Sequence, residues 1–272
     1  MVKIDYNKCV VCESCIEDCF FKALSNEDGK IVVNEEKCRN CGHCIAICPQ
    51  NAVVSIDLDM KEVKEYSKNE FYIESDKILN LIKFRRSTRR FKDQKIKRDE
   101  IEKIIEAGRF TPTGGNSQGV SYIVVEDKLR EITKLGLETL NSLGEDILST
   151  ENIDQNLIRY ANNWTTGYKK YLENPNDDTY LFFNAKTIVL LTSNSPVDAA
   201  LAASNMELMA NAMGVGVCFS GYFVRAVNSN KEIRDVLGME EDQKVQVCMI
   251  MGYPDMEYFR TVPRNKAKVR FI

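Results

Sequence analysis

From residue 78 onward, apolar positions alternate between helical spacing and short continuous runs. Ile78, Leu81 and Ile82 fall on one face of a predicted helix that Ser75 or Asp76 caps. Short apolar runs bounded by polar residues or glycine favour buried strands. Such runs lie at 122–125, 187–191 and 245–251. The alternation predicts an α+β domain in which helices flank a central sheet.

Three further segments have helical spacing. Asp99 is placed to cap a helix whose apolar positions begin at Ile101. The segment 198–213 is rich in alanine, methionine and leucine and is apolar on most sides, so we expect it to be buried centrally or in a subunit interface. A last helix covers about 231–237, and Gly238 is placed to end it.

The first 58 residues are a duplicated unit with a period of 29 residues. Each half has the pattern C-x-x-C-x-x-C-x-x-x-C and a short β segment, at 31–33 and 53–56. Residues 59–77 are mostly polar and charged. We therefore predict a small domain over 1–58, a linker over 59–77 and a second domain over 78–272.

Composition and charge exclude several classes of protein. The chain is 44% hydrophobic and 28% charged, with 14 Gly and 6 Pro, which fits a globular protein. The net charge is −3, too close to neutral to suggest a nucleic-acid partner. No apolar run is long enough for a membrane span, and the N-terminus lacks a secretory signal. We expect a cytoplasmic protein with no membrane partner.

The cysteine spacing points to two iron–sulfur clusters. Three closely spaced thiolates converge on one centre, and the fourth, beyond a turn, serves the other cluster. One [4Fe–4S] cluster is thus assigned to Cys9, Cys12, Cys15 and Cys48. The second is assigned to Cys19, Cys38, Cys41 and Cys44. A disulfide framework would need an oxidising compartment. Structural zinc favours paired C-x-x-C units instead of three cysteines in tandem.

With all eight cysteines in place, residues 1–58 resemble a bacterial two-cluster ferredoxin. Phe20 stands where the second half has proline, so the turn and the shielding of its cluster are expected to differ. His43 is expected to be an exposed loop residue. Cys218 and Cys248 have apolar neighbours and are expected to be buried packing residues.

A basic stretch opens the second domain. Residues 83–98 contain nine Lys/Arg and one acid, which suits either a solvated basic face or an anion site. Within it, Arg85-Arg86-Ser87-Thr88-Arg89-Arg90-Phe91 closely resembles the opening motif of the nitroreductase family of flavin enzymes. Further segments resemble later motifs of that family and occur in its order: 111–118, 198–213, 214–221, 251–254 and 263–266. Gly119 stands where the family usually has proline.

The resemblance implies a homodimer with FMN at its interface, the flavin loops coming from different subunits. The flavin phosphate and ring edge are then assigned to Arg85, Arg86, Ser87 and Arg89. The pyrimidine edge is assigned to Asn116 and Gln118. Backbone contacts near N5 are assigned to Ser220 and Gly221, and completion of the phosphate site to Arg264 and Lys266. The segment 214–221 is expected to be a loop that approaches the flavin ring. No catalytic side chain is implied, because the chemistry belongs to flavin N5.

The segment 136–182 covers the substrate pocket in that family. Its aromatic side chains fit pocket walls and domain core equally well. They include Trp164, Tyr168, Tyr171 and Tyr180.

A cluster domain joined to a flavin domain predicts an oxidoreductase. The leading hypothesis is that electrons enter at the clusters and pass to FMN, which reduces a small organic acceptor of the nitroaromatic or quinone type. A ferredoxin or another redox protein would then be the donor. In an alternative, NAD(P)H reduces the flavin and the clusters pass electrons to a protein acceptor. In a third, the protein is a non-catalytic electron carrier or redox sensor.

Overall fold

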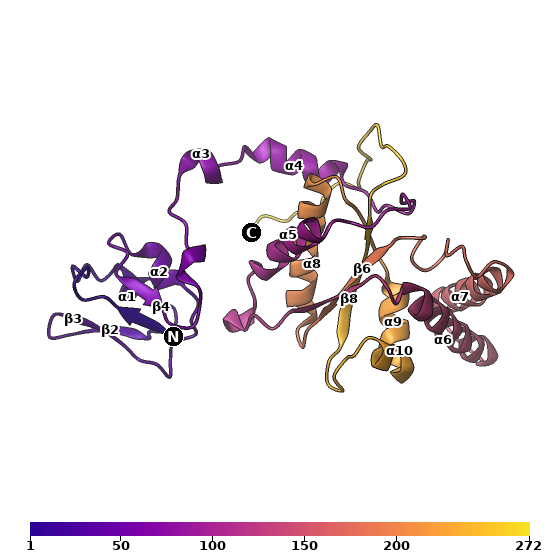
Figure 1. Cartoon of the computed structure of the whole chain (residues 1–272), viewed down its shortest axis with the longest axis horizontal. Helices are drawn as coiled ribbons and strands as arrows, with labels where there is room; N and C mark the ends of the chain where they lie inside the picture. The colour runs from indigo at the N-terminus through magenta and orange to yellow at the C-terminus, as the bar shows by residue number, and fades with distance from the viewer. The chain divides into compact units, whose positions relative to one another are not determined.

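The computed structural model describes all 272 residues and divides into two compact units. The first comprises residues 1–73 and 113–117, and the second comprises residues 74–112 and 118–272. Figure 1 shows the chain with its helices and strands labelled. None of the helices combines the length and the apolar character that crossing a membrane would require.

The first unit is built from short elements. They are β1 (Val2–Ile4), α1 (Ser14–Glu17), β2 (Leu24–Glu27), β3 (Lys30–Val33), α2 (His43–Ile47), β4 (Val53–Ser55), η1 (Met60–Glu62) and α3 (Lys68–Phe71). Strand β1 pairs antiparallel with β4, and β2 pairs antiparallel with β3. A shift of 29 residues relates β1 to β3 and β2 to β4, so the β segment at 31–33 belongs to the second half and not to the first. The first strand of each half thus pairs with the last strand of the other half, and the two repeats are interlocked.

The repeat in the sequence is also a repeat in the backbone. Val11 and Asn40, which are 29 residues apart, have φ of 54° and 50°. Lys22 and Asn51, separated by the same interval, both have φ of 50°. The turn that follows Phe20 and the turn that follows Pro49 therefore each have a residue with left-handed backbone conformation at the equivalent position. The expected difference between these two turns is not present in the backbone.

The core of the first unit is small. Its fully buried members are Val2, Cys15, Leu24, Ile31, Cys44 and Val53. Two of these six are cysteines, and four more cysteines pack around them half-buried. A domain of this size buries little apolar surface. Its stability must therefore depend on what the cysteines hold.

The second unit is an α+β domain. Its elements are α4 (Ser75–Phe84), α5 (Arg98–Arg109), β5 (Ser121–Val125), α6 (Leu129–Ser149), α7 (Gln155–Glu173), β6 (Thr187–Thr192), α8 (Pro196–Ala212), β7 (Gly216–Phe219), α9 (Gly221–Ser229), α10 (Lys231–Val236) and β8 (Val245–Gly252). The four strands form one antiparallel sheet in the order β5-β6-β8-β7.

Helices cover both faces of this sheet, as Figure 1 shows. Ile188 and Leu190 of β6 point into a core shared with α6, α7, α9 and α10. The alternate residues Val189 and Leu191 point into a second core, formed with α5 and α8. Because successive side chains of a strand face opposite ways, a strand buried on both faces is apolar along its centre, as at 188–191. All six residues of β6 are buried.

The predicted strands and helices of this unit are present, with shifted ends. Helix α5 begins at Arg98 with Lys97 as its N-cap, so Asp99 lies inside the helix and does not cap it. Helix α8 begins at Pro196, where the Ser195 side chain accepts a hydrogen bond from the Asp198 N–H at 3.2 Å. Gly238 has φ of 64° just beyond α10.

Three helices and one strand of the second unit were not predicted: α6, α7, α9 and β7. The expectation of a loop over 214–221 was wrong, because Gly216–Phe219 forms the edge strand β7 and α9 begins at Gly221. His43 is exposed as expected, but it begins helix α2 instead of lying in a loop. Cys218 and Cys248 are buried, as predicted. Within 59–77, the structure has η1, α3 and the first residues of α4.

Candidate functional site

The eight N-terminal cysteines line two separate cavities. The first cavity contains Cys9, Cys12, Cys15 and Cys48. The second contains Cys19, Cys38, Cys41 and Cys44. The interlocked strands bring the fourth cysteine of each half to the three cysteines of the other half. These two groups of four are the groups that the spacing predicts.

The fourth cysteine of each group is held by the backbone. The Ala23 N–H donates to Cys19 Sγ at 3.3 Å, and the Ala52 N–H donates to Cys48 Sγ at 3.3 Å. An N–H donor stabilises the thiolate form of a cysteine. Thiolate is the form that binds metal. The fourth cysteine is therefore held in the same way in both sites.

Burial acts in the opposite direction on the central cysteines. It raises the pKa of the Cys15 thiol, and it raises the pKa of the Cys44 thiol to about 11. Four thiols facing one apolar-walled cavity are the donor set of an iron–sulfur cluster. The residues present thus fit such a cluster in each cavity.

The two cavities differ at equivalent positions of the repeat. Where the first is lined by an aliphatic, a hydroxyl and an amide side chain, the second is lined by a cation, an imidazole and an aromatic ring. The pairs are Val10 and Arg39, Ser14 and His43, and Gln50 and Phe21. Charges and hydrogen bonds around a cluster set its reduction potential. The two sites are therefore electrostatically unequal.

In the second unit, the basic segment runs along the edge strand β7. Ser87 forms an isolated parallel bridge to Val217, and the Thr88 N–H donates to the Val217 carbonyl at 2.9 Å. Gly216 allows this approach, because a Cβ at that position would lie 2.5 Å from Thr88 Oγ1. The edge of the sheet thus fixes the backbone from which Arg85, Ser87 and Arg89 project.

Arg85 has a buried partner that the sequence did not reveal. Its Nη1 lies 3.3 Å from Oε1 of Glu207 on α8, and the Glu207 side chain is buried. Burial raises the pKa of Glu207, and the Arg85 charge only partly opposes this shift. In Arg86, Nη2 donates to the Lys83 carbonyl at 2.8 Å, whereas the buried Nε has no partner. An unpaired buried donor suits an anion-binding site.

Ser220 and Gly221 lie where β7 ends and α9 begins. The Ser220 N–H donates to the Cys248 carbonyl at 2.9 Å, and its hydroxyl accepts from the Phe223 N–H at 3.2 Å. The N–H of Ser220 is thus already bonded within the sheet, and its hydroxyl caps helix α9. Of the backbone contacts assigned to this pair, the Gly221 N–H is therefore the better placed to serve a ligand.

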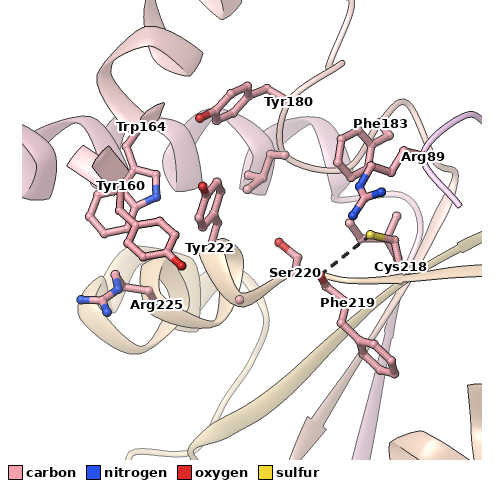
Figure 2. A pocket seen from close by; sticks show the side chains of 13 residues that line it. Arg89, Tyr160, Trp164, Tyr180, Phe183, Cys218, Phe219, Ser220, Tyr222 and Arg225 are labelled. Carbon is pink, nitrogen blue, oxygen red and sulfur yellow. Dashed lines mark hydrogen bonds between the residues drawn. The ribbon is translucent and has the colours of Figure 1, made fainter. Parts of the chain in front are cut away.

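A pocket of about 510 Å³ is lined by residues of the basic segment, of β7 and of α9. Figure 2 shows that Arg89, Cys218 and Ser220 lie at one side of the pocket and that a group of aromatic rings lies at the other. Burial raises the pKa of the Cys218 thiol, opposed by the nearby Arg89 charge. The pocket has the size and the mixed lining of a small-molecule site.

The remaining predicted flavin contacts are not among the residues that line this pocket. Asn116 is grouped with the first unit, where its Nδ2 donates to the Arg39 carbonyl at 3.1 Å and the Asn40 carbonyl at 3.3 Å. Gln118 is exposed, with φ of 48°. Residues 264 and 266 lie in the exposed C-terminal stretch that follows β8 without regular secondary structure.

The sequence left the role of the aromatic residues in 136–182 open, and the structure gives them both roles. Trp164 and Tyr180 line the pocket, and Trp164 is also part of the buried core to which Tyr171 belongs. Tyr222 and Arg225 also line the pocket and were not predicted. The helical spacing of Phe223, Ala226 and Val227 behind a serine cap was the available signal for α9.

Comparison with known proteins gives matches for both units. Residues 82–253 match the model of the nitroreductase family, and residues 1–53 match the model of a 4Fe-4S dicluster domain. A putative NADH dehydrogenase/NAD(P)H nitroreductase of Archaeoglobus fulgidus is 26% identical over 67% of this chain and 88% of its own length. An NADPH-dependent oxidoreductase of Staphylococcus aureus is 30% identical over 60% of each chain. The chain thus spans less than two thirds of that second relative.

The fold of the second unit also occurs among solved structures. A nitroreductase with bound FMN from Bacteroides fragilis superposes with a TM-score of 0.53 at 23% identity. The match covers 73% of this chain and 99% of the other. At this level of identity the match shows that the fold is shared.

Proposed function

Because this chain belongs to the nitroreductase family, we propose that it is an FMN-dependent oxidoreductase that also carries two [4Fe–4S] clusters. The proposed reaction begins with one-electron input at the cluster domain and ends with the two-electron reduction of a small nitroaromatic or quinone acceptor. The observation that carries the flavin assignment is the convergence of Arg89, Ser220 and Gly221 on one pocket beside the basic segment.

The residues of the second unit fit FMN. Arg85 and Ser87, with the unpaired Nε of Arg86, suit the phosphate, because guanidinium groups and hydroxyls donate to phosphate oxygens. Arg89 supplies positive charge at the pocket wall, where it would favour an electron-rich ring edge. Once bound, FMN exchanges electrons singly or as hydride.

The cysteines of the first unit fit the two clusters. Each cavity offers four thiols, and the two groups draw on both halves of the repeat. We assign the first cluster to the cavity with Cys48 and the second to the cavity with Cys19. The match to a 4Fe-4S dicluster domain supports this assignment.

A second direction of electron flow has support from the relatives. One is named for NADPH, and another for NADH and NAD(P)H. A nicotinamide that docks at the flavin pocket would deliver hydride there, and electrons would then leave one at a time through the clusters to a protein acceptor. This function uses the same residues with the opposite direction of transfer.

We also propose that the protein is a homodimer through its second unit. Exposed apolar side chains gather on α4 and α8, two helices that pack against each other. On α4 they are Ile78, Leu79, Ile82 and Phe84, and on α8 they are Val197 and Leu201. Large exposed apolar side chains on two neighbouring helices are typical of an interaction site in a globular protein.

The test is anaerobic reduction of the purified, oxidised protein. Iron, sulfide and flavin are assayed first, and the flavin band is then followed after mixing with reduced ferredoxin, NADH or NADPH. Fast bleaching by reduced ferredoxin, lost in a Cys9→Ser/Cys19→Ser variant without clusters, supports entry at the clusters. Bleaching by a nicotinamide in both proteins supports the opposite direction. Absence of flavin would contradict the proposal.

A further inference from the structure

The side of the pocket opposite Arg89 is an aromatic wall. Trp164 and Tyr222 meet edge to face with their centroids 5.9 Å apart, and Tyr180 stacks on Tyr222 at 6.3 Å. Tyr160 stacks on Trp164 at 6.3 Å and meets Tyr222 edge to face at 6.1 Å. Figure 2 shows these four rings grouped on the same side. Such a wall favours a planar aromatic ligand.

The Tyr180 ring of this wall is held in place by helix α7. Helix α7 approaches the Tyr180 ring through Gly167, where a Cβ would lie 2.2 Å from a ring carbon. The Tyr180 hydroxyl donates to the Asn163 carbonyl. Burial also raises the pKa of Tyr180 to about 12, so its hydroxyl stays neutral at physiological pH. Tyr180 is therefore held in place and carries no negative charge.

The charge around this wall is positive. The lining of the pocket includes Arg89 and Arg225 and no aspartate or glutamate. Arg89 lies beside the proposed flavin contacts, whereas Arg225 lies at the aromatic side with its Cζ 5.3 Å from the Trp164 ring centroid. Arg225 forms no salt bridge. Its charge is thus available to an anionic group of a ligand.

The wall also contains an unsatisfied donor. Trp164 is only 2% exposed, and its Nε1 has no hydrogen-bond partner. Leaving a buried donor unpaired costs about 1–3 kcal/mol. An acceptor atom that enters between the rings beside Arg225 would pair with this N–H. The same acceptor atom, if charged, would also be attracted to the guanidinium.

We infer that the aromatic side of this pocket binds an aromatic acid: a planar ring against Trp164, Tyr180 and Tyr222, with its carboxylate toward Arg225 and Trp164 Nε1. This places the reducible group of such a compound toward the Arg89 side. That the aromatic acid is a substrate rests on the proposed function, whereas its binding does not. This inference narrows the proposed acceptors from nitroaromatics and quinones in general to those that carry an anionic group.

The test compares three probes on the oxidised holoprotein. Benzoate has the ring and the charge, benzyl alcohol has the ring alone, and acetate has the charge alone. Trp164 is the only tryptophan of the chain, so its fluorescence reports binding directly. The flavin absorption band gives a second readout. We expect benzoate to bind at least about 10-fold more tightly than benzyl alcohol, since a charge-assisted hydrogen bond contributes about 1.5–3 kcal/mol, and acetate to give no signal.

Two variants and one control locate the anion site. Arg225→Met keeps the aliphatic stem and should reduce the affinity for benzoate to that for benzyl alcohol. Trp164→Phe keeps a ring without the N–H donor and should lower the affinity for benzoate severalfold. Because this variant has no tryptophan, its affinity is measured from the flavin absorption band. Arg159→Met is the matched control, because Arg159 lies over the Tyr160 ring at 5.6 Å but does not line the pocket. It should leave the preference for benzoate unchanged.

The outcomes separate the two proposals. Equal affinities for benzoate and benzyl alcohol, or equal effects of Arg225→Met and Arg159→Met, would overturn the aromatic-acid site while leaving the flavin function intact. Absence of bound flavin would overturn the proposed function, and Trp164 fluorescence would still report on the pocket. As a second measurement, 4-nitrobenzoate should exceed nitrobenzene in kcat/KM by about the same factor as in binding, and Arg225→Met should abolish the difference.

Discussion

Glu207 is a buried carboxylate that faces one arginine. Its folded-state pKa is raised, first because of burial and despite the opposing charge of Arg85. A raised pKa means that the folded protein binds this proton more tightly than the unfolded chain does. The stability associated with the protonated group is present below the unfolded pKa. It is lost as the pH rises through the folded pKa.

This sign gives a prediction for Glu207→Gln. The amide cannot ionise, so the variant should gain stability relative to the wild type as the pH rises from about 4.5, the usual range of a glutamate, to neutral. The melting temperatures of the two proteins are measured over that range, where 1 kcal/mol corresponds to about 2–4 °C for a domain of this size. The exposed Glu241→Gln is the control. A difference in melting temperature that does not vary with pH would refute the prediction.

The fourth cysteine of each half is the residue that interlocks the two metal sites. If Cys48 serves the first cluster, the variant Cys9→Ser/Cys48→Ser damages one site and should keep the other cluster. The variant Cys9→Ser/Cys19→Ser damages both sites and should lose both clusters. Iron, sulfide and the EPR signal of the reduced protein distinguish these cases.

Cys248→Ala is the control for the cysteine variants, because Cys248 is buried in the second unit and lines neither cavity. It should retain the full iron content. If Cys9→Ser/Cys48→Ser loses as much iron as Cys9→Ser/Cys19→Ser or more, the proposed exchange of ligands between the halves is wrong.

At the scale of elements, the contact between β7 and the basic segment controls the phosphate end of the site. Gly216→Ala would place a methyl group 2.5–2.8 Å from three side-chain atoms of Thr88. Overpacking of this kind costs about 1–3 kcal/mol. We expect the segment to shift away from β7, with a lower melting temperature and weaker FMN binding, measured by flavin fluorescence.

Gly108→Ala offers a comparison within the same unit. Its methyl group would lie 2.8 Å from Met206 Sδ and 2.8 Å from the Tyr122 hydroxyl, and neither residue belongs to the basic segment. It should affect FMN binding less than Gly216→Ala does. Unchanged FMN affinity in Gly216→Ala would show that the position of the basic segment does not depend on this strand.

At the scale of the whole molecule, the apolar surface of α4 and α8 predicts a dimer in solution. Leu201 is 47% exposed on α8, and Leu201→Glu would place a charge in the proposed interface. We expect this variant to sediment as a monomer and to retain less FMN, since the flavin is expected at the interface. Leu157→Glu is the control, because Leu157 is 38% exposed on α7. A monomeric wild-type protein would contradict the prediction.

The repeat, the cysteine groups and the three strands predicted for the second unit could be predicted from the sequence by itself. The reason is that these features have local signatures in the sequence. Each C-x-x-C-x-x-C-x-x-x-C run is continuous, and a strand buried on both faces contains a continuous apolar run, as at 188–191. The basic motif around Ser87 was also readable, because its residues are consecutive.

Only the tertiary structure decided the parts of the site that join distant segments. Glu207 contacts Arg85, which is 122 positions away in the sequence, and no local sequence pattern predicts such a pair. Trp164 and Tyr222 come from different helices, and whether an aromatic ring is core or pocket wall depends on what packs against it. The edge strand β7 was expected to be part of a loop because 214–221 resembles a loop of the nitroreductase family, whereas the structure pairs 216–219 with β8. Sequence thus determined the ligands and the strands, and packing determined how the pocket is shaped and charged.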